Sequence, residues 1–170
     1  MNTKRRFITL VTVLYIGLFC SACRKEVAVV DLMIPRLHLE GRVMNYGSMT
    51  TQRMIMPKSK TTIEVIKQPL ISEFDIMNAE MVKVDLGMAL LLQLSEQGAR
   101  NLYRASVVNK GNRIVVTING NPVGFRRIDG PIMDGNLFCF IEMNTSAMEE
   151  LVLSLKKTAK YLQTYSKQSR

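Results

Sequence analysis

The sequence predicts an α+β fold, a two-layer sandwich in which two helices cover one face of a mostly antiparallel sheet. Three observations support this prediction. Asn119-Gly120 separates two strand-like runs and has the residues that a tight hairpin turn needs. Apolar side chains recur at helical spacing from Met148 to Leu162. The segments follow one another in the order strand, strand, helix, strand, hairpin, strand, helix, which fits such a sandwich.

The first half of the chain is expected to form strands, because apolar and polar residues alternate and Thr, Ile and Val are frequent there. A loop at residues 45–51, rich in turn residues, follows the first strand. The expected strands are residues 36–43, 61–71, 81–87 and 89–94. The last two of these form a hairpin that turns near Gly87.

A helix is expected over residues 98–110. It begins near Ser95 and ends at Gly111, a residue type that favours helix termination. Four of its residues recur at three- and four-residue spacing: Leu102, Tyr103, Ser106 and Val107.

The second half is expected to contain three strands and a long helix. Residues 113–118 and 122–128 flank the Asn119-Gly120 turn, and the mostly apolar segment 137–143 is expected to be buried on both faces. Ser146 and Glu149 have the spacing of a capping box, which predicts that a helix begins there.

The N-terminus has the pattern of a secretory signal peptide. Lys4, Arg5 and Arg6 precede an uncharged run over residues 7–20, and Ser21-Ala22-Cys23 follows. The segment Cys20-Ser21-Ala22-Cys23 resembles a bacterial lipobox, so we expect a signal peptide at residues 1–22 and lipid attachment at Cys23. Two alternatives stay open: a retained anchor helix, disfavoured because about 20 apolar residues are needed to cross a bilayer, and an unmodified Cys23.

Cleavage would change both the charge and the cysteine content of the chain. The full sequence carries a net charge of +9, and removing residues 1–22 leaves +6. Residues 23–36 would form a tether, 37–165 the domain and 166–170 a frayed tail. Cys139 would be the one cysteine left without a lipid, and its apolar neighbours predict a buried hydrophobic residue rather than a nucleophile.

Several weak motifs between residues 61 and 162 together resemble the first periplasmic domain of SecD, a protein-export subunit. They are Gly98-Ala99-Arg100, Gly111-Asn112-Arg113, 114–118, Asn119-Gly120, Pro131-Ile132, Asp134-Gly135 and 146–150. Where SecD usually carries Ser-Ala-Pro after its hairpin, this chain reads Gly124-Phe125-Arg126-Arg127. The resemblance implies a detached SecD-like α+β domain, here expected on a lipid anchor, and fold similarity alone does not transfer function.

No motif for catalysis, cofactor binding or metal binding stands out. His38, the only histidine, alternates with leucines and is expected to face solvent or a polar sheet edge. Asp129, Asp134 and Glu142 could act as paired carboxylates, but Asp-Gly steps are common in turns. The sequence therefore favours a protein that is not an enzyme and needs no cofactor or metal.

Phe125, Arg126 and Arg127 are the candidate partner-contact residues, and a merely solvated strand face is the alternative. The expected function is that of an envelope lipoprotein whose domain binds a polypeptide or partner protein, in connection with protein export. A structural or assembly subunit is the alternative function, and an envelope hydrolase ranks last. Because the chain is expected to be exported, we expect no nucleic-acid partner. Arg24 after Cys23 favours the periplasmic side of the outer membrane in a cell with two membranes.

Overall fold

The computed structural model describes residues 32–41 and 49–168. The expected signal peptide, Cys23 and most of the tether lie outside the described residues. Residues 32–170 cluster as one compact unit. No helix among the described residues is long and apolar enough to cross a membrane.

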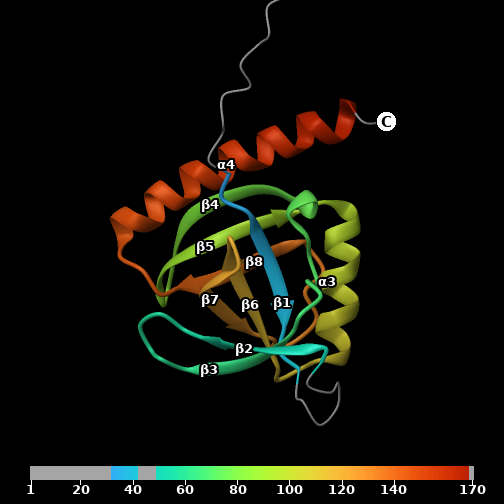
Figure 1. The fold of residues 1–170 in the computed structure, drawn as a ribbon, viewed down its shortest axis with the longest axis vertical. Helices are drawn as coiled ribbons and strands as arrows, with labels where there is room; N and C mark the ends of the chain where they lie inside the picture. The colour runs from blue at the N-terminus through green and yellow to red at the C-terminus, as the bar shows by residue number, and fades with distance from the viewer. Residues whose placement is uncertain (1–31, 42–48, 169–170) are drawn as a thin grey trace, which may run out of the picture. The chain divides into compact units, whose positions relative to one another are not determined.

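Six strands form one curled sheet (Figure 1). Their order across the sheet is β1-β6-β7-β8-β5-β4, and each neighbouring pair is antiparallel. This arrangement confirms the predicted α+β class with a mostly antiparallel sheet. The strands are β1 (Pro35–Leu39), β4 (Ile76–Val84), β5 (Gly87–Leu94), β6 (Arg113–Ile118), β7 (Asn121–Arg127) and β8 (Asn136–Ile141).

Two helices, α3 (Glu96–Val108) and α4 (Thr145–Gln168), pack on one face of this sheet (Figure 1). Leu102 of α3 and Leu155 of α4 belong to the same buried cluster as Leu90 of β5 and Ile114 of β6. A short 3-10 helix, η1 (Glu73–Asp75), precedes β4. The two-layer sandwich with both helices on one face is therefore present.

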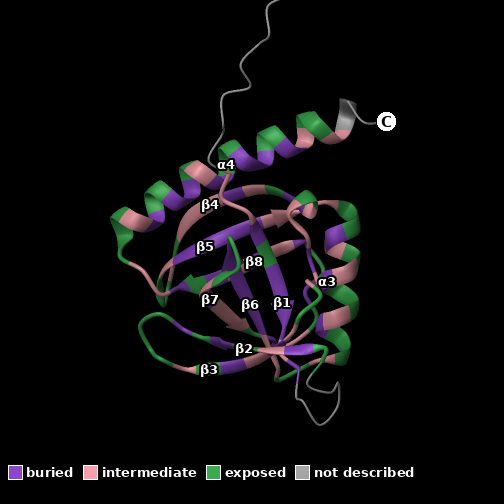
Figure 2. Ribbon diagram, viewed as in Figure 1, coloured by how far each residue is buried: buried purple, intermediate pink, exposed green. Residues whose placement is uncertain are grey.

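A second hairpin, which the sequence analysis did not predict, covers part of the other face. It consists of β2 (Thr51–Ile55) and β3 (Thr62–Ile66), and the second of these is shorter than the strand expected over 61–71. Met54, Met56 and Ile63 from the hairpin form a second buried cluster with Val115 of β6. Figure 2 shows these buried segments in purple. The sheet thus has a helical layer on one side and a partial β layer on the other.

The hairpin explains why the expectation for His38 is wrong. The side chain is 5% exposed, and its Nδ1 lies 3.0 Å from the carbonyl oxygen of Ile66 in β3. A carbonyl can only accept, so Nδ1 carries the proton. Burial lowers the pKa of His38, more than this hydrogen bond raises it, and Arg36 lowers it further.

Two of the predicted element ends are confirmed, and one predicted helix cap is wrong. Ser95 caps α3, because its hydroxyl accepts a hydrogen bond from the Gly98 amide at 3.1 Å. Asn119 and Gly120 both have positive φ, as their tight turn requires. Ser146 does not cap α4: Asn144 does, and its Oδ1 accepts from the Ala147 amide at 2.8 Å.

Three further boundaries differ from the expectations. Pro35 and Arg36, assigned to the tether, already belong to β1. β4 begins at Ile76, five residues before the expected strand. α4 continues to Gln168 and so includes the first residues of the expected frayed tail.

Candidate binding groove on the open half of the sheet

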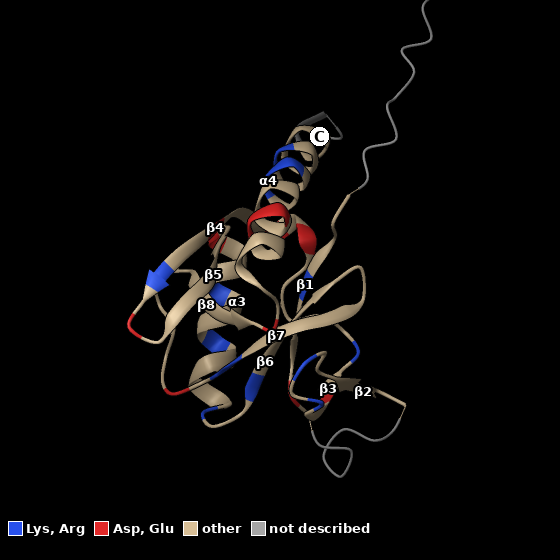
Figure 3. Ribbon diagram, turned by 90° about the vertical axis from the view of Figure 1, so that its left-hand side faces the viewer, with Lys and Arg blue, Asp and Glu red and all other residues tan. Residues whose placement is uncertain are grey.

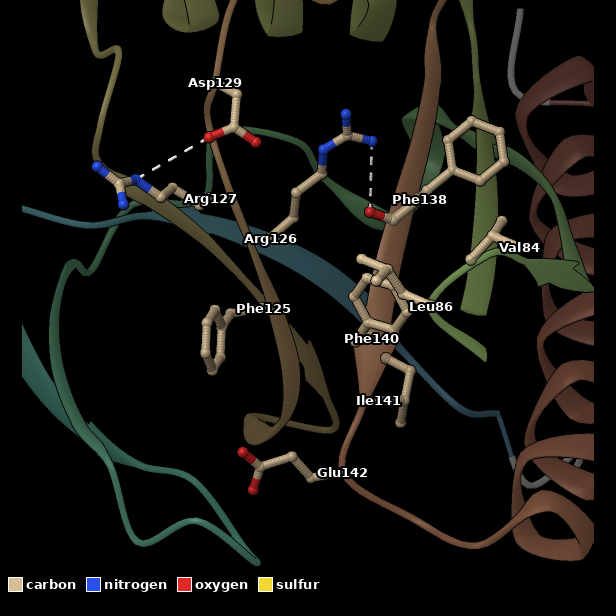
Figure 4. A pocket seen from close by; sticks show the side chains of 10 residues that line it. All are labelled: Val84, Leu86, Phe125, Arg126, Arg127, Asp129, Phe138, Phe140, Ile141 and Glu142. Carbon is tan, nitrogen blue, oxygen red and sulfur yellow. Dashed lines mark hydrogen bonds and ion pairs between the residues drawn. The ribbon is translucent and has the colours of Figure 1, made fainter. Parts of the chain in front are cut away.

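An open groove of about 670 Å³ lies on the sheet face opposite the helices, beside the β2–β3 hairpin. We call it the groove. It is built from the ends of β4, β7 and β8 and from the turn between β4 and β5 (Figure 4). Its lining residues are Val84, Leu86, Phe125, Arg126, Arg127, Asp129, Phe138, Phe140, Ile141 and Glu142.

The groove exists because β7 and β8 pair over only a short distance and then diverge. Their register consists of two pairs, Gly124 with Ile141 and Phe125 with Phe140. Gly124 permits this close pairing, since a Cβ at this position would lie 2.3 Å from the carbonyl oxygen of Phe140. Beyond these two residue pairs, β7 continues along β6 while β8 continues along β5, and the space between β7 and β8 opens.

The wall of the groove is apolar. Phe138 and Phe140 alternate along β8 and point to the face away from the helical core, whereas Leu137, Cys139 and Ile141 point into that core. Phe140 is 43% exposed. The expectation that this strand is buried on both faces is therefore wrong, because the hairpin covers β6 and β7 but stops short of β8. Leu86, at the β4–β5 turn, is 83% exposed.

One end of the groove is basic. The guanidinium of Arg126 donates a long hydrogen bond of 3.5 Å to the carbonyl oxygen of Phe138, across the gap between the strands (Figure 4). Arg127 is exposed and lies 4.0 Å from the carboxylate of Asp129, which is exposed as well. Neither contact is tight, so both guanidinium groups can turn toward a ligand.

Phe125 differs from the two arginines that follow it. Its ring packs against the cluster under the β2–β3 hairpin, and the guanidinium of Arg113 lies 5.8 Å from the ring centre. Arg113 itself is held by the carboxylate of Glu40 at 2.6 Å, which raises its pKa. Phe125 therefore joins the rim of the groove to the core below the hairpin.

Glu142, at the other end of the groove, holds the turn of the β2–β3 hairpin. Its carboxylate accepts from the amides of Lys58 and Ser59 at 2.8 and 3.0 Å and from the Ser59 hydroxyl at 2.6 Å. Burial alone would raise the pKa of Glu142, but these hydrogen bonds outweigh it and the pKa is lowered. This carboxylate is thus occupied in fixing the hairpin beside the groove.

The three residues singled out in the sequence, Phe125, Arg126 and Arg127, all line the groove. Sequence reasoning missed its apolar wall, formed by Val84, Leu86, Phe138 and Phe140, because these residues come from segments more than 50 positions apart. The one signal that could have revealed it is the alternation in Leu137-Phe138-Cys139-Phe140-Ile141, with its large aromatic residues at every second position.

The other candidate chemical groups lie in structural roles. Cys139 is fully buried, as expected, and desolvation raises the pKa of its thiol to about 12. The carboxylate of Asp134 accepts from the amide of Asn136 at 3.1 Å in a turn. Within the described ranges, His, Cys, Asp and Glu side chains do not gather in any group of three that could hold a metal ion.

Two solved structures match the fold. One is a crystal structure of SecDF in its super-membrane-facing form, with a TM-score of 0.53 and 16% identity, covering 73% of this chain and 18% of that chain. The other is SecDF, described as a membrane component that enhances protein export, with a TM-score of 0.55 and 14% identity, covering 75% of this chain and 64% of that chain. The described domain has a SecDF-like fold. No protein-family model and no curated protein matches the chain.

These matches confirm the predicted resemblance to SecD at the level of the fold. The chain spans less than two thirds of either SecDF chain, so the SecDF-like domain corresponds to a part of a larger protein. At this low identity, residue roles do not carry over, and the groove must be judged on its own geometry.

Proposed function

We propose that this chain is a non-catalytic lipoprotein of the cell envelope, anchored through Cys23, whose SecDF-like domain holds an extended segment of another polypeptide in the groove. The observation that carries the proposal is the apolar sheet face left open beside the hairpin, with Phe140 and Leu86 at the surface. Large apolar side chains gathered at the surface of a soluble domain mark binding sites.

The divergence of β7 and β8 suits an extended ligand. An inserted segment would place apolar side chains against Phe138 and Phe140, and its backbone would run along the open side of β8. The carbonyl oxygen of Phe138 has a 3.5 Å hydrogen bond from Arg126, which a backbone amide of the ligand can replace with a shorter one. The released guanidinium, together with Arg127, then favours a ligand with an acidic residue at that end.

Proteins that are being exported are ligands of this kind. SecDF is described as enhancing protein export. We infer that the SecDF-like domain here corresponds to the first periplasmic domain of SecD and faces the periplasm, on the outer membrane in a cell with two membranes. Chains that emerge unfolded during export expose apolar segments, which the groove could hold until they fold.

Binding to an unfolded chain tests the groove. The probe is a reduced and carbamidomethylated protein that stays unfolded, and affinity is measured by fluorescence anisotropy. Leu86→Asp places a charge on the groove wall at a residue that is 83% exposed, so the fold should persist. We expect at least a tenfold loss of affinity. Met133→Asp is the matched control, because Met133 is 76% exposed and lies outside the groove.

Equal affinities of the two variants would contradict the proposed site. A stable complex of fixed stoichiometry with one envelope protein, seen by size exclusion and insensitive to Leu86→Asp, would instead favour the assembly-subunit alternative.

The lipid anchor is tested separately. Mass spectrometry of the mature protein is expected to show an N-terminal Cys23 with a diacylglycerol mass added, and Cys23→Ala is expected to release the protein from membranes. An unmodified Cys23 or a retained residue 1–22 segment would contradict the anchor but leave the groove untouched.

A further inference from the structure

We propose that the outward face of α4 rests on an anionic phospholipid surface. This outward face consists of Leu153, Lys156, Lys157, Lys160, Tyr161 and Tyr165, all exposed. The inference rests on the proposed function in one respect, the lipid on Cys23, and its test uses protein without that lipid.

The burial pattern of α4 separates two faces sharply. Leu151, Val152, Leu155, Ala159 and Leu162 pack against the sheet, and the exposed residues occupy the opposite half of the helix. Figure 2 shows this alternation along the helix, and Figure 1 shows that no other described element covers its outer side. The outward face therefore meets either solvent or a partner.

The composition of the outward face fits a membrane interface. From Leu151 to the end of α4 there is no Asp or Glu, so its lysines meet no acidic side chain on their own helix (Figure 3). Lysines on an amphipathic helix attract anionic headgroups, while Tyr and Leu side chains enter the boundary between headgroups and acyl chains. Leu153 and two tyrosines are exposed beside these lysines, so the face offers apolar as well as cationic groups.

The start of the described chain lies against α4, within reach of the expected anchor. The amide of Met33 donates a hydrogen bond of 3.1 Å to the hydroxyl of Thr158, in the middle of α4. Met33 is ten positions after Cys23, and ten residues span at most about 36 Å even when fully extended. A lipid on Cys23 therefore keeps Met33, and α4 beside it, within about 36 Å of the bilayer surface.

The groove lies on the sheet face opposite α4. Docking of α4 on a membrane would consequently leave the groove directed away from the lipid and open to the periplasm. The two surfaces serve different ligands and can be tested independently.

Vesicle binding tests the inference with the chain from residue 23 onward carrying Cys23→Ser, so that no lipid is attached. We expect binding to vesicles of phosphatidylcholine with 30% phosphatidylglycerol, no binding to pure phosphatidylcholine, and release in 0.5 M NaCl. Replacing Lys156, Lys157 and Lys160 with Gln should lower the partition coefficient about 100-fold, since each lysine near the surface contributes about fivefold.

The matched control replaces three exposed basic residues outside α4, Lys58, Arg104 and Lys110, with Gln. It changes the net charge equally and should change binding much less. An equal loss in both triple variants, or failure of the unlipidated chain to bind anionic vesicles, would overturn the inference. Binding to heparin without binding to vesicles would do the same.

Fluorescence quenching tests separately whether α4 contacts the bilayer. The chain contains no Trp, so Tyr161→Trp introduces a single indole on the outward face. Brominated lipids in anionic vesicles should quench its fluorescence. Tyr103→Trp on α3 is the control, because Tyr103 and Tyr161 are similarly exposed, at 43% and 39%. Equal quenching, or none at residue 161, would contradict a lipid-facing α4.

Discussion

Gly124 sets the geometry of the groove at the scale of single residues. It lies where β7 and β8 approach most closely, and a Cβ there would also meet the Ile141 side chain at 2.8 Å. Neither strand can move away without opening the core on the other face. Gly124 opens the Gly124-Phe125-Arg126-Arg127 segment that departs from the SecD pattern, and the close approach of the two strands favours glycine there.

Gly124→Ala is expected to destabilise the domain by about 1–3 kcal/mol, the usual range for overpacking. Urea unfolding would measure this loss. Gly130→Ala is the matched control, because a Cβ at Gly130 would meet no atom within 4 Å. A Gly124→Ala variant as stable as the control would show that the two strands are not held together as described.

His38 gives the domain a pH-dependent stability. Its pKa is lowered from the ordinary value of 6.5 in the folded protein, so the unfolded chain binds a proton more readily. Stability is therefore full above about pH 6.5 and decreases as the pH falls below it, by at most about 1.4 kcal/mol per pH unit for one group.

Urea midpoints measured between pH 7.5 and 5 should show this decrease for the natural chain. His38→Gln can still donate to the Ile66 carbonyl but does not titrate, and it should remove most of the slope between pH 6.5 and 5.5. An unchanged slope in that variant would mean that other groups cause the acid sensitivity.

At the scale of elements, the β2–β3 hairpin decides which part of the sheet is open. It buries Val115 and His38 and leaves Phe140 exposed. The sequence predicted the other strands from alternation, from frequent Thr, Ile and Val, from the Asn119-Gly120 turn and from the apolar run at 137–143, and it predicted the helices from spacing. It missed β2, because Gln52 and Arg53 interrupt a short run and its burial depends on Met54 meeting residues distant in the sequence. The face of the groove could not be predicted without that element.

Glu142 is expected to hold the hairpin beside the groove. Glu142→Ala removes the acceptor for the amides of Lys58 and Ser59, and hydrogen exchange at these two amides should become at least tenfold faster. Glu150→Ala, at an exposed position on α4, is the control and should leave both amides protected. Unchanged exchange in Glu142→Ala would show that the turn is held by its own backbone.

At the scale of the whole molecule, the domain has two distinct surfaces on opposite sides of one sheet. The helical side carries a basic and aromatic helix next to the start of the described chain, and the other side carries the groove. The sequence predicted this architecture, and the structure places Phe125, Arg126 and Arg127 on the lining of one groove. The sequence indicated two arginines beside one aromatic residue, whereas the larger part of the groove lining is apolar and comes from β8 and the β4–β5 turn.

Site-specific photo-crosslinking in cells tests most directly whether the groove holds polypeptide. Benzoylphenylalanine replaces Phe140 in the groove in one strain and Tyr103 on α3 in another, two aromatic residues that are each 43% exposed. We expect crosslinks from residue 140 to exported polypeptides during active export, which stop when export is blocked, and few crosslinks from residue 103. Equal crosslinking at both positions, or none at residue 140, would contradict it.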